Sequence, residues 1–375
     1  MAHYERDGQV VGWGPTVQEI DALAQIFNDI RHIGCLYPSP APPSALPYSS
    51  ERVHFIGVPP AGGKHLKDKL GILRLSQVYF RAMLKEIPKA DVVHVRCPAN
   101  ISLLAIVLLA FLRHPKYRWV KYAGNWRPNG REAWSYTFQR WWLNKGLHRG
   151  VVTVNGRWSR QPKHVYSFLN PCLTCEEVES ARTIALSKEL SPPYNLLFVG
   201  RVESTKGVGR LLKITKELHR QGIPIKVDIV GDGPERKDFE AWTKENGLPS
   251  FVTFHGWMPK PALAEFYNRA HFFVFPSSAS EGWPKVLSEA MAYGAVLIAG
   301  AVSSIPQVLS ETGAGLSFPP DDIHAFVQAI LDFIDQPERW RAASQAGVAA
   351  APLFTYEHYL EKVKQMFWDA WRVRL

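Results

Sequence analysis

Short runs of apolar residues alternate along the chain with longer stretches in which apolar residues recur every three or four positions. The short runs are rich in β-branched and aromatic residues and predict buried strands, whereas the longer stretches predict amphipathic helices. Strands that alternate with helices favour a parallel sheet covered on both faces. After a short strand pair within His3–Val11, the strands predicted in the N-terminal half are His32–Leu36, Val53–Val58, Val92–Val95, Trp119–Ala123 and Val151–Val154.

The alternation restarts after Pro192-Pro193, which we interpret as a domain boundary. A second doubly wound domain should therefore follow the first, and a final helix from about Tyr356 to Trp371 should follow that. The predicted division is 1–190, 191–353 and 354–375. In the second domain we predict strands at Asn195–Gly200, Ile225–Val230, Val252–His255 and Phe272–Phe275, and helices at Val208–Arg220, Glu235–Asn246 and Pro261–Ala270.

The composition is that of a globular protein, because 46% of the 375 residues are hydrophobic and 21% are charged. The longest apolar run, Ile101 to Leu112, is too short to cross a bilayer and predicts a buried helix. With no signal-peptide pattern at the start, we expect a cytoplasmic protein. Cys172-x-x-Cys175 has no second cysteine pair at a suitable spacing, so we expect neither a disulfide framework nor a metal site.

The charge is concentrated in the N-terminal half, where residues 1–190 carry 25 Lys and Arg against 14 Asp and Glu. Two stretches there, Lys64–Lys89 and Arg127–Arg149, combine basic residues with apolar ones at helical spacing. Tryptophans lie among them in the second stretch. Such helices suit an anionic membrane surface, although the apolar stripes could equally pack on the sheet while the cations are solvated. We therefore expect either buried packing helices or peripheral contact with the inner membrane.

The chain's most distinctive stretch runs from Ser280 to Gly294, after the predicted strand Phe272–Phe275. Pro284 suits the first position of a helix and Gly294 suits the residue just beyond its end, so a helix is predicted from about Pro284 to Tyr293. The N–H groups of Lys285, Val286 and Leu287 would then point out of the helix start. Free N–H groups and aligned peptide dipoles favour a phosphate at that position.

Two carboxylates, Glu281 and Glu289, belong to the same stretch. Carboxylates repel a bare phosphate, so their presence indicates a ligand that also carries hydroxyl groups. Glu289 could accept the hydroxyls of a ribose, and Glu281 those of a sugar beyond the phosphates. The alternative is a solvated amphipathic helix whose glutamates have no ligand.

Glu281-x7-Glu289, with Gly282 after the first glutamate, resembles the signature of the retaining GT-B glycosyltransferases of family 4. The resemblance covers roughly Asn195 to Ile334. Four further blocks occur in the order typical of that family: Phe198-Val199-Gly200-Arg201 with Lys206-Gly207, Val230-Gly231-Asp232-Gly233-Pro234, Phe254-His255-Gly256, and Gly313-Ala314-Gly315-Leu316. It implies an α/β fold of two Rossmann-like doubly wound domains that face a cleft.

The resemblance also implies roles for individual residues. Arg201 and Lys206 would neutralise the donor diphosphate, and since the chain contains no Asp-x-Asp, no metal is expected. Glu281 would bind and orient the donor sugar. Gly14 either approaches the phosphates or forms a plain tight turn. The complete predicted donor site is Gly14, Gly200, Arg201, Lys206, Gly256, Trp257, Glu281, Gly282, Trp283, Lys285, Val286, Leu287 and Glu289.

The loop that holds Asn125 and Trp126 follows a predicted strand end, so both are predicted to contact the acceptor. The resulting hypothesis is a metal-independent retaining glycosyltransferase that moves a sugar from a nucleotide-diphosphate sugar to a glycan or lipid-linked acceptor in envelope or exopolysaccharide synthesis. One alternative is a nucleotide-sugar epimerase of the same fold. The other, which the aliphatic helical stripes disfavour, is a basic nucleic-acid-binding protein.

Overall fold

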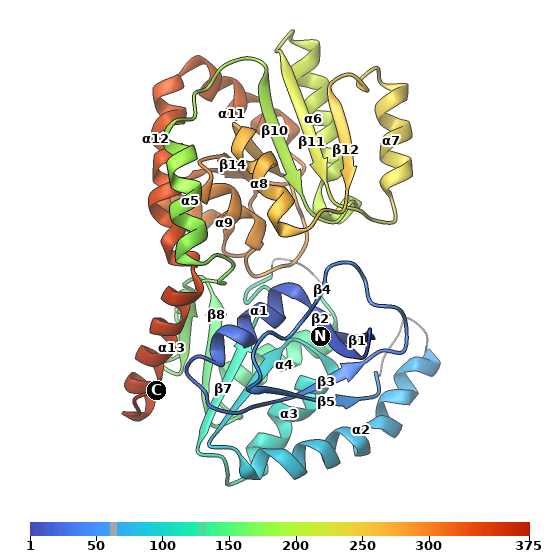
Figure 1. Ribbon diagram of the computed structural model, residues 1–375, viewed down its shortest axis with the longest axis vertical. Helices are drawn as coiled ribbons and strands as arrows, with labels where there is room; N and C mark the ends of the chain where they lie inside the picture. Colours follow the sequence, from blue (N-terminus) through green and yellow to red (C-terminus); the bar gives the residue numbers. More distant parts are fainter. Residues whose placement is uncertain (61–65, 129, 131) are drawn as a thin grey trace. The chain divides into compact units, whose positions relative to one another are not determined.

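The computed structural model describes residues 1–60, 66–128, 130 and 132–375, and of residues 66–74 it describes the backbone only. The chain divides into two compact units (Figure 1). Unit 1 consists of Met1–Leu169 together with Tyr359–Leu375, and unit 2 consists of Asn170–His358. Each unit is an α/β domain of strands alternating with helices, which confirms the predicted fold class.

Unit 1 begins with a hairpin. Asp7 and Gly8 both have positive φ, 52° and 75°, as the tight turn between two antiparallel strands requires. The predicted strand pair is thus confirmed, but it makes this sheet mixed rather than parallel throughout. The strands are β1 Ala2–Arg6, β2 Gln9–Trp13, β3 Ile30–Leu36, β4 Ala45–Pro47 and β5 Val53–Val58, in the order β4-β2-β1-β3-β5.

The second sheet of unit 1 is parallel, in the order β6-β7-β8-β9. Its strands are β6 Val92–Cys97, β7 Tyr117–Tyr122, β8 Val151–Asn155 and β9 Val165–Phe168. Strand β9 was not predicted, because its four residues include the polar Ser167 and so form no uninterrupted apolar run. The helices of unit 1 are α1 Gly14–Leu23, α2 Leu66–Glu86, α3 Asn100–Phe111 and α4 Trp134–Asn144, with a 3-10 turn η1 at Ile87–Lys89.

The predicted final helix is confirmed as α13, Tyr356–Trp371. From Tyr359 onward it belongs to unit 1. Its apolar side packs against Trp119 of β7 and Leu23 of α1 through Leu360, Val363 and Phe367. The end of the chain therefore completes the core of the first domain.

Unit 2 contains one parallel sheet in the order β12-β11-β10-β13-β14-β15. Its strands are β10 Tyr194–Val199, β11 Ile225–Val230, β12 Val252–Gly256, β13 Phe272–Phe275, β14 Val296–Gly300 and β15 Gly315–Phe318. The helices are α5 Cys175–Leu186, α6 Val208–Arg220, α7 Arg236–Glu245, α8 Lys260–Arg269, α9 Lys285–Ala292, α10 Ile305–Thr312, α11 Ile323–Asp335 and α12 Pro337–Ala350, with 3-10 turns η2 Ser204–Lys206 and η3 Ala351–Phe354.

The division between the units differs from the predicted one, because residues 170–190 belong to unit 2. Thr174 and Glu177 form a reciprocal capping box at the start of α5, and Lys260 of α8 pairs with Glu177 at 2.6 Å. Asn170 donates to the Trp283 carbonyl at 3.3 Å. Composition suggested a boundary at Pro192-Pro193, but these long-range contacts fix the segment to the second domain.

Candidate functional site

The C-terminal ends of parallel strands lie at one edge of their sheet, and in unit 2 the predicted donor residues follow those ends (Figure 1). Gly200 and Arg201 follow β10, Trp257 follows β12, and the loop before α9 follows β13. Because loops beyond strand C-termini are where doubly wound sheets bind ligands, this edge is the candidate site.

Helix α9 begins at Lys285, and Pro284 is its N-cap rather than its first residue. The Leu287 N–H donates to the Pro284 carbonyl at 3.1 Å, so it is not available to a phosphate as predicted. Gly294 has a φ of 69°, which is the left-handed conformation expected just beyond the helix end. The strand, loop and helix order is therefore as predicted, with a first turn tighter than expected.

The loop after β10 packs directly on the loop after β13. The Ser278 N–H donates to the Thr205 carbonyl at 2.9 Å, and Ser277 Oγ donates to the same carbonyl at 3.3 Å. These contacts bring Lys206 beside Glu281, and the two form an ion pair. Glu281 is 40% exposed and Lys206 only 16%. The structure thus joins two side chains that lie 75 positions apart in the sequence.

Gly207 makes this close approach possible. Its φ is +94°, and an added Cβ would lie 2.3 Å from the Pro276 carbonyl oxygen. We predict that Gly207→Ala displaces the Glu281 loop and destabilises unit 2 by about 2 kcal/mol or more. Urea unfolding would measure this change.

A matched control for this prediction is Gly222→Ala. Gly222 also has a positive φ, +76°, but an added Cβ there meets nothing within 4 Å. The control substitution introduces the backbone strain without a steric clash, so it should lower the free energy of unfolding by only about 1 kcal/mol. If both variants lowered the free energy of unfolding equally, the close packing of Gly207 on Pro276 would contribute nothing to stability.

Arg201 is exposed, and its Nε lies 3.1 Å from Glu203. The loop that carries it is held by backbone contacts, since the Gly200 N–H donates to the Val230 carbonyl at 3.0 Å. Gly231, with a φ of +135°, lies against the backbone of Gly200, so that an added Cβ would be 1.9 Å from the Gly200 carbonyl oxygen. Glu203 was not predicted, and a glutamate two residues after an arginine gives no signal in sequence.

Glu289 accepts a hydrogen bond from the Tyr267 hydroxyl at 2.8 Å. Burial raises the pKa of Glu289, and the bond from Tyr267 partly opposes that shift. Burial also raises the pKa of Tyr267 well above its usual value, so this hydroxyl stays protonated and donates. Tyr267 was missed because a tyrosine on an amphipathic helix is indistinguishable in sequence from an ordinary core residue.

Trp283 was predicted to lie close to the sugar and phosphate, but its side chain is buried and 3% exposed. The ring stacks on Phe354 with centroids 5.3 Å apart, and Nε1 donates to Ser288 Oγ at 2.7 Å. We therefore interpret this ring as a packing element beneath the loop. Neighbouring Lys285 is half-buried, and its charge lowers the pKa of Glu289.

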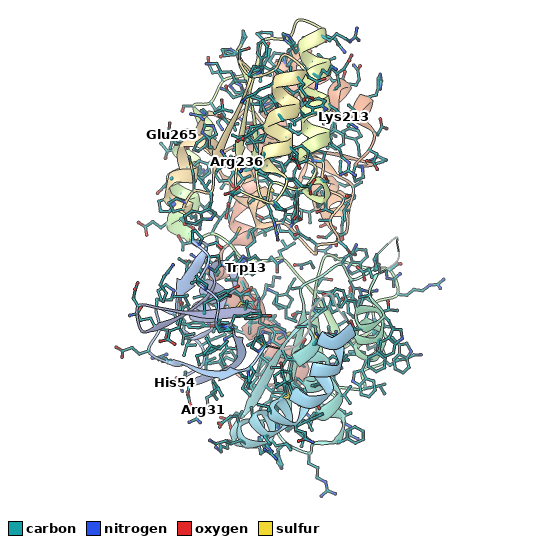
Figure 2. All side chains as sticks on the ribbon, turned by 90° about the vertical axis from the view of Figure 1, so that its right-hand side faces the viewer. Trp13, Arg31, His54, Lys213, Arg236 and Glu265 are labelled. Atoms are coloured by element: carbon teal, nitrogen blue, oxygen red, sulfur yellow. The ribbon has the colours of Figure 1, made fainter. Side chains whose placement is uncertain are left out.

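Trp257 is 45% exposed and directly follows Gly256, whose φ is +76°. The guanidinium of Arg236 lies over this glycine, since an added Cβ would be 2.8 Å from Nη1. Arg236, labelled in Figure 2, is the first residue of α7, and its Nη2 donates to the Phe254 carbonyl at 3.2 Å. An exposed indole and an adjacent guanidinium could stack on a flat ring.

The predicted residues of unit 1 are mostly enclosed. The ring of Trp126 belongs to the hydrophobic core, and Asn125 is 5% exposed with its side-chain oxygen accepting from the Arg127 N–H at 3.1 Å. Because both side chains are buried, we interpret them as structural residues rather than as acceptor contacts. Gly14 begins α1, and a Cβ there would lie 3.0 Å from the Ser44 carbonyl, so the tight packing alone accounts for this glycine.

Unit 1 also holds a buried charge cluster that the sequence did not reveal. Glu19 of α1 is 1% exposed and pairs with Arg96 and Lys121, each at 2.7 Å. Arg96 and Lys121 are aligned neighbours on β6 and β7. The Tyr359 hydroxyl of α13 donates to Glu19 at 3.1 Å. One carboxylate therefore holds two adjacent cations and the final helix together.

Two kinds of feature are absent from the residues that the structure describes. Among these residues, no group of three or more His, Cys, Asp or Glu side chains is placed to hold a metal ion. In the same part of the chain, no helix combines the length and apolar character needed to cross a membrane.

Residues 184–349 match the model of the family described as glycosyl transferases group 1. Among curated relatives, the chain is 29% identical over 190 residues to alpha-D-kanosaminyltransferase of Streptomyces kanamyceticus, which covers 49% of each protein. It is 29% identical over 174 residues to O-antigen chain mannosyltransferase B of Escherichia coli, covering 43% of this chain and 42% of that protein. The chain thus spans less than half the length of these relatives.

Solved structures resemble the chain over nearly its whole length. Anabaena HepE in complex with UDP matches with a TM-score of 0.67 at 15% identity, covering 98% of this chain and 99% of that one. Sucrose-phosphate synthase from Thermosynechococcus elongatus matches with a TM-score of 0.67 at 20% identity, covering 94% and 91%. At such identities the likeness shows the fold, which is the GT-B fold of two Rossmann-like domains.

Proposed function

Because residues 184–349 match the model of the glycosyl transferases group 1 family, we propose that this protein is a retaining glycosyltransferase acting on a nucleotide-diphosphate sugar. The observation that carries the proposal is the Lys206–Glu281 ion pair at the C-terminal edge of the unit 2 sheet. It supports the proposal because a cation can bind phosphate and the neighbouring carboxylate can accept hydrogen bonds from sugar hydroxyls. A nucleotide sugar presents both groups next to each other.

The chemistry requires charge neutralisation. As the glycosidic bond to the diphosphate breaks, negative charge grows on the leaving oxygen, and fixed cations stabilise it. Lys206 supplies a point charge, exposed Arg201 supplies a planar fork, and the start of α9 supplies the positive end of a helix dipole. Since the chain provides these charges itself, the proposal requires no metal ion.

The two glutamates have separate tasks. Glu281 exchanges its contact with Lys206 for the hydroxyls of the donor sugar when the diphosphate takes up the lysine, and it helps the oxocarbenium-like transition state electrostatically. Glu289, oriented by Tyr267, accepts the ribose hydroxyls. We assign the base to Trp257 and the backbone of Gly256, because Gly256 ends β12 and Trp257 follows it.

A thermal-shift panel tests the donor part of the proposal. UDP, GDP and ADP and their sugars are added in turn, and we predict that one nucleoside diphosphate raises the melting temperature. At a ligand concentration of about 100 times Kd the stabilisation is about 2.7 kcal/mol, because the ligand binds only the folded state. Panel members that all leave the melting temperature unchanged would contradict a nucleotide-sugar site.

For the acceptor we propose a glycan or lipid-linked glycan in cell-envelope or exopolysaccharide synthesis, at the cytoplasmic face of the membrane. Two curated relatives carry names from such processes, an amylovoran biosynthesis glycosyltransferase of Erwinia amylovora and the O-antigen mannosyltransferase. The basic N-terminal half suits an anionic surface there. An epimerase requires no acceptor, so incubating a labelled donor with and without acceptor distinguishes the two functions.

A further inference from the structure

Helix α4 carries aromatic residues on its solvent side and a polar residue on its inner side. Trp134 and Trp141 are 75% and 50% exposed, whereas Gln139 is completely buried. Within the described part of the chain, the amide oxygen and nitrogen of Gln139 have no hydrogen-bond partner. Packing within unit 1 alone favours the reverse arrangement, because burying an aromatic ring stabilises and burying an unpaired amide costs free energy.

The exposed rings of Trp134 and Trp141 belong to one cluster with the partly buried rings of Phe138 and Trp142. The Phe138 ring lies 5.5 Å from that of Trp134, 5.7 Å from Trp141 and 5.6 Å from Trp142, measured between centroids. Trp142 Nε1 donates to the Ile106 carbonyl of α3 at 3.1 Å. The aromatic stripe of α4 is therefore held firmly against the neighbouring helix.

Two further exposed apolar side chains belong to the C-terminal ends of α3 and α4, which Arg118 links. Its guanidinium donates to the Leu109 and Leu112 carbonyls at the end of α3, and at 3.4 Å to the His148 carbonyl beyond α4. Phe111 and Leu147, 77% and 38% exposed, belong to these two ends. We call the combined set the α4 aromatic surface: Phe111, Trp134, Phe138, Trp141, Trp142 and Leu147.

The charge around this surface is strongly positive. Residues 92–175 contain thirteen Lys and Arg and one acidic residue, Glu132, which pairs with Arg140. Exposed cations flank both helix ends, namely Arg113, Lys116, Lys145 and Arg149. An apolar surface bordered by cations is complementary to a bilayer with anionic headgroups, in which tryptophan prefers the interface.

We propose that the α4 aromatic surface inserts into the interface of an anionic lipid bilayer. This inference rests on the proposed function, since a lipid-linked acceptor would be presented there. A bilayer fits better than single-stranded nucleic acid, because exposed Phe111 and Leu147 at the linked helix ends add apolar side chains that make no hydrogen bonds to bases. The apolar insertion makes binding partly resistant to salt.

The experiment is cosedimentation of the full chain with vesicles of phosphatidylcholine containing about one third phosphatidylglycerol, at about 0.1 M and about 0.5 M NaCl. The test variant is Trp134→Ser with Trp141→Ser. The matched control is Trp368→Ser on α13, which also removes a partly exposed tryptophan of unit 1. We expect the wild type and the control to bind at both salt concentrations, and the test variant to bind at least about tenfold more weakly.

The proposal is overturned if the wild type does not bind vesicles, if the test variant binds as well as the control, or if the wild type binds single-stranded RNA instead. The thermal shift with a nucleoside diphosphate is measured on the same samples. An intact shift in the test variant shows that it is folded and that its donor site is unaffected. A missing shift in the wild type, with vesicle binding retained, would contradict the proposed function while leaving the membrane surface standing.

Discussion

Replacing Lys206 by alanine should lower kcat/KM for the nucleotide-sugar donor by about 10²-fold to 10³-fold, measured as release of nucleoside diphosphate. The variant removes a cation that acts where the leaving diphosphate gains charge, and the loss of one such preorganised group typically costs about 2.7–4 kcal/mol of transition-state stabilisation. It also leaves Glu281 without its ion-pair partner. Without this partner the carboxylate of Glu281 repels the donor phosphates, which lowers kcat/KM further.

The matched control is Lys213→Ala. Lys213 is exposed on α6, the helix that follows the Lys206 turn, and Figure 2 labels it there. It lies outside the proposed site, so its removal should leave kcat/KM within about twofold. Unchanged turnover in the Lys206 variant would remove that lysine from the proposed mechanism.

Replacing Glu19 by glutamine should destabilise unit 1 by about 3–5 kcal/mol. The change removes the carboxylate charge that pairs with the adjacent cations Arg96 and Lys121, and removing one partner of a buried ion pair costs about this much. Burial is the main cause that raises the pKa of Tyr359 well above its usual value, and it persists in the variant, so the hydroxyl stays protonated and can donate to the amide oxygen of the new glutamine. Hydrogen exchange of unit 1 peptides would measure the change separately from unit 2.

Two companion variants make this result specific. Glu361→Gln removes an exposed pair with Lys364 and should cost less than about 0.5 kcal/mol. Adding Lys121→Met to Glu19→Gln removes one of the two buried cations that paired with Glu19 and should recover part of the stability. A Glu19 variant as stable as the Glu361 variant would mean that the cluster contributes no net stability.

Much of the fold followed from periodicity alone. Strands β11 and β13 and helices α6 and α13 have the predicted bounds, because alternating residues in β11, an uninterrupted apolar run in β13 and amphipathic stripes in the helices leave little choice of structure. The domain boundary did not follow, since residues 170–190 are assigned to unit 2 by contacts such as Lys260 with Glu177. A local composition change carries no information about such partners.

The site could be predicted only in part for the same reason. A family resemblance pointed to Lys206 and Glu281, and the structure pairs them, but it also buries Trp283 beneath the loop. Tyr267 and Glu203, which orient Glu289 and Arg201, have no signature in sequence. Whether a side chain faces ligand or core is decided by its tertiary neighbours, as Trp283 and Trp126 both show.

The central claim is that this chain transfers a sugar from a nucleotide to a separate acceptor. The most direct measurement uses a donor labelled in its sugar, incubated with the protein in the presence and absence of a lipid-linked or glycan acceptor fraction. The account predicts that labelled glycan and free nucleoside diphosphate appear together, and only when acceptor is present. Conversion of the donor into an isomeric sugar without acceptor, or release of neither product with any donor, would contradict it.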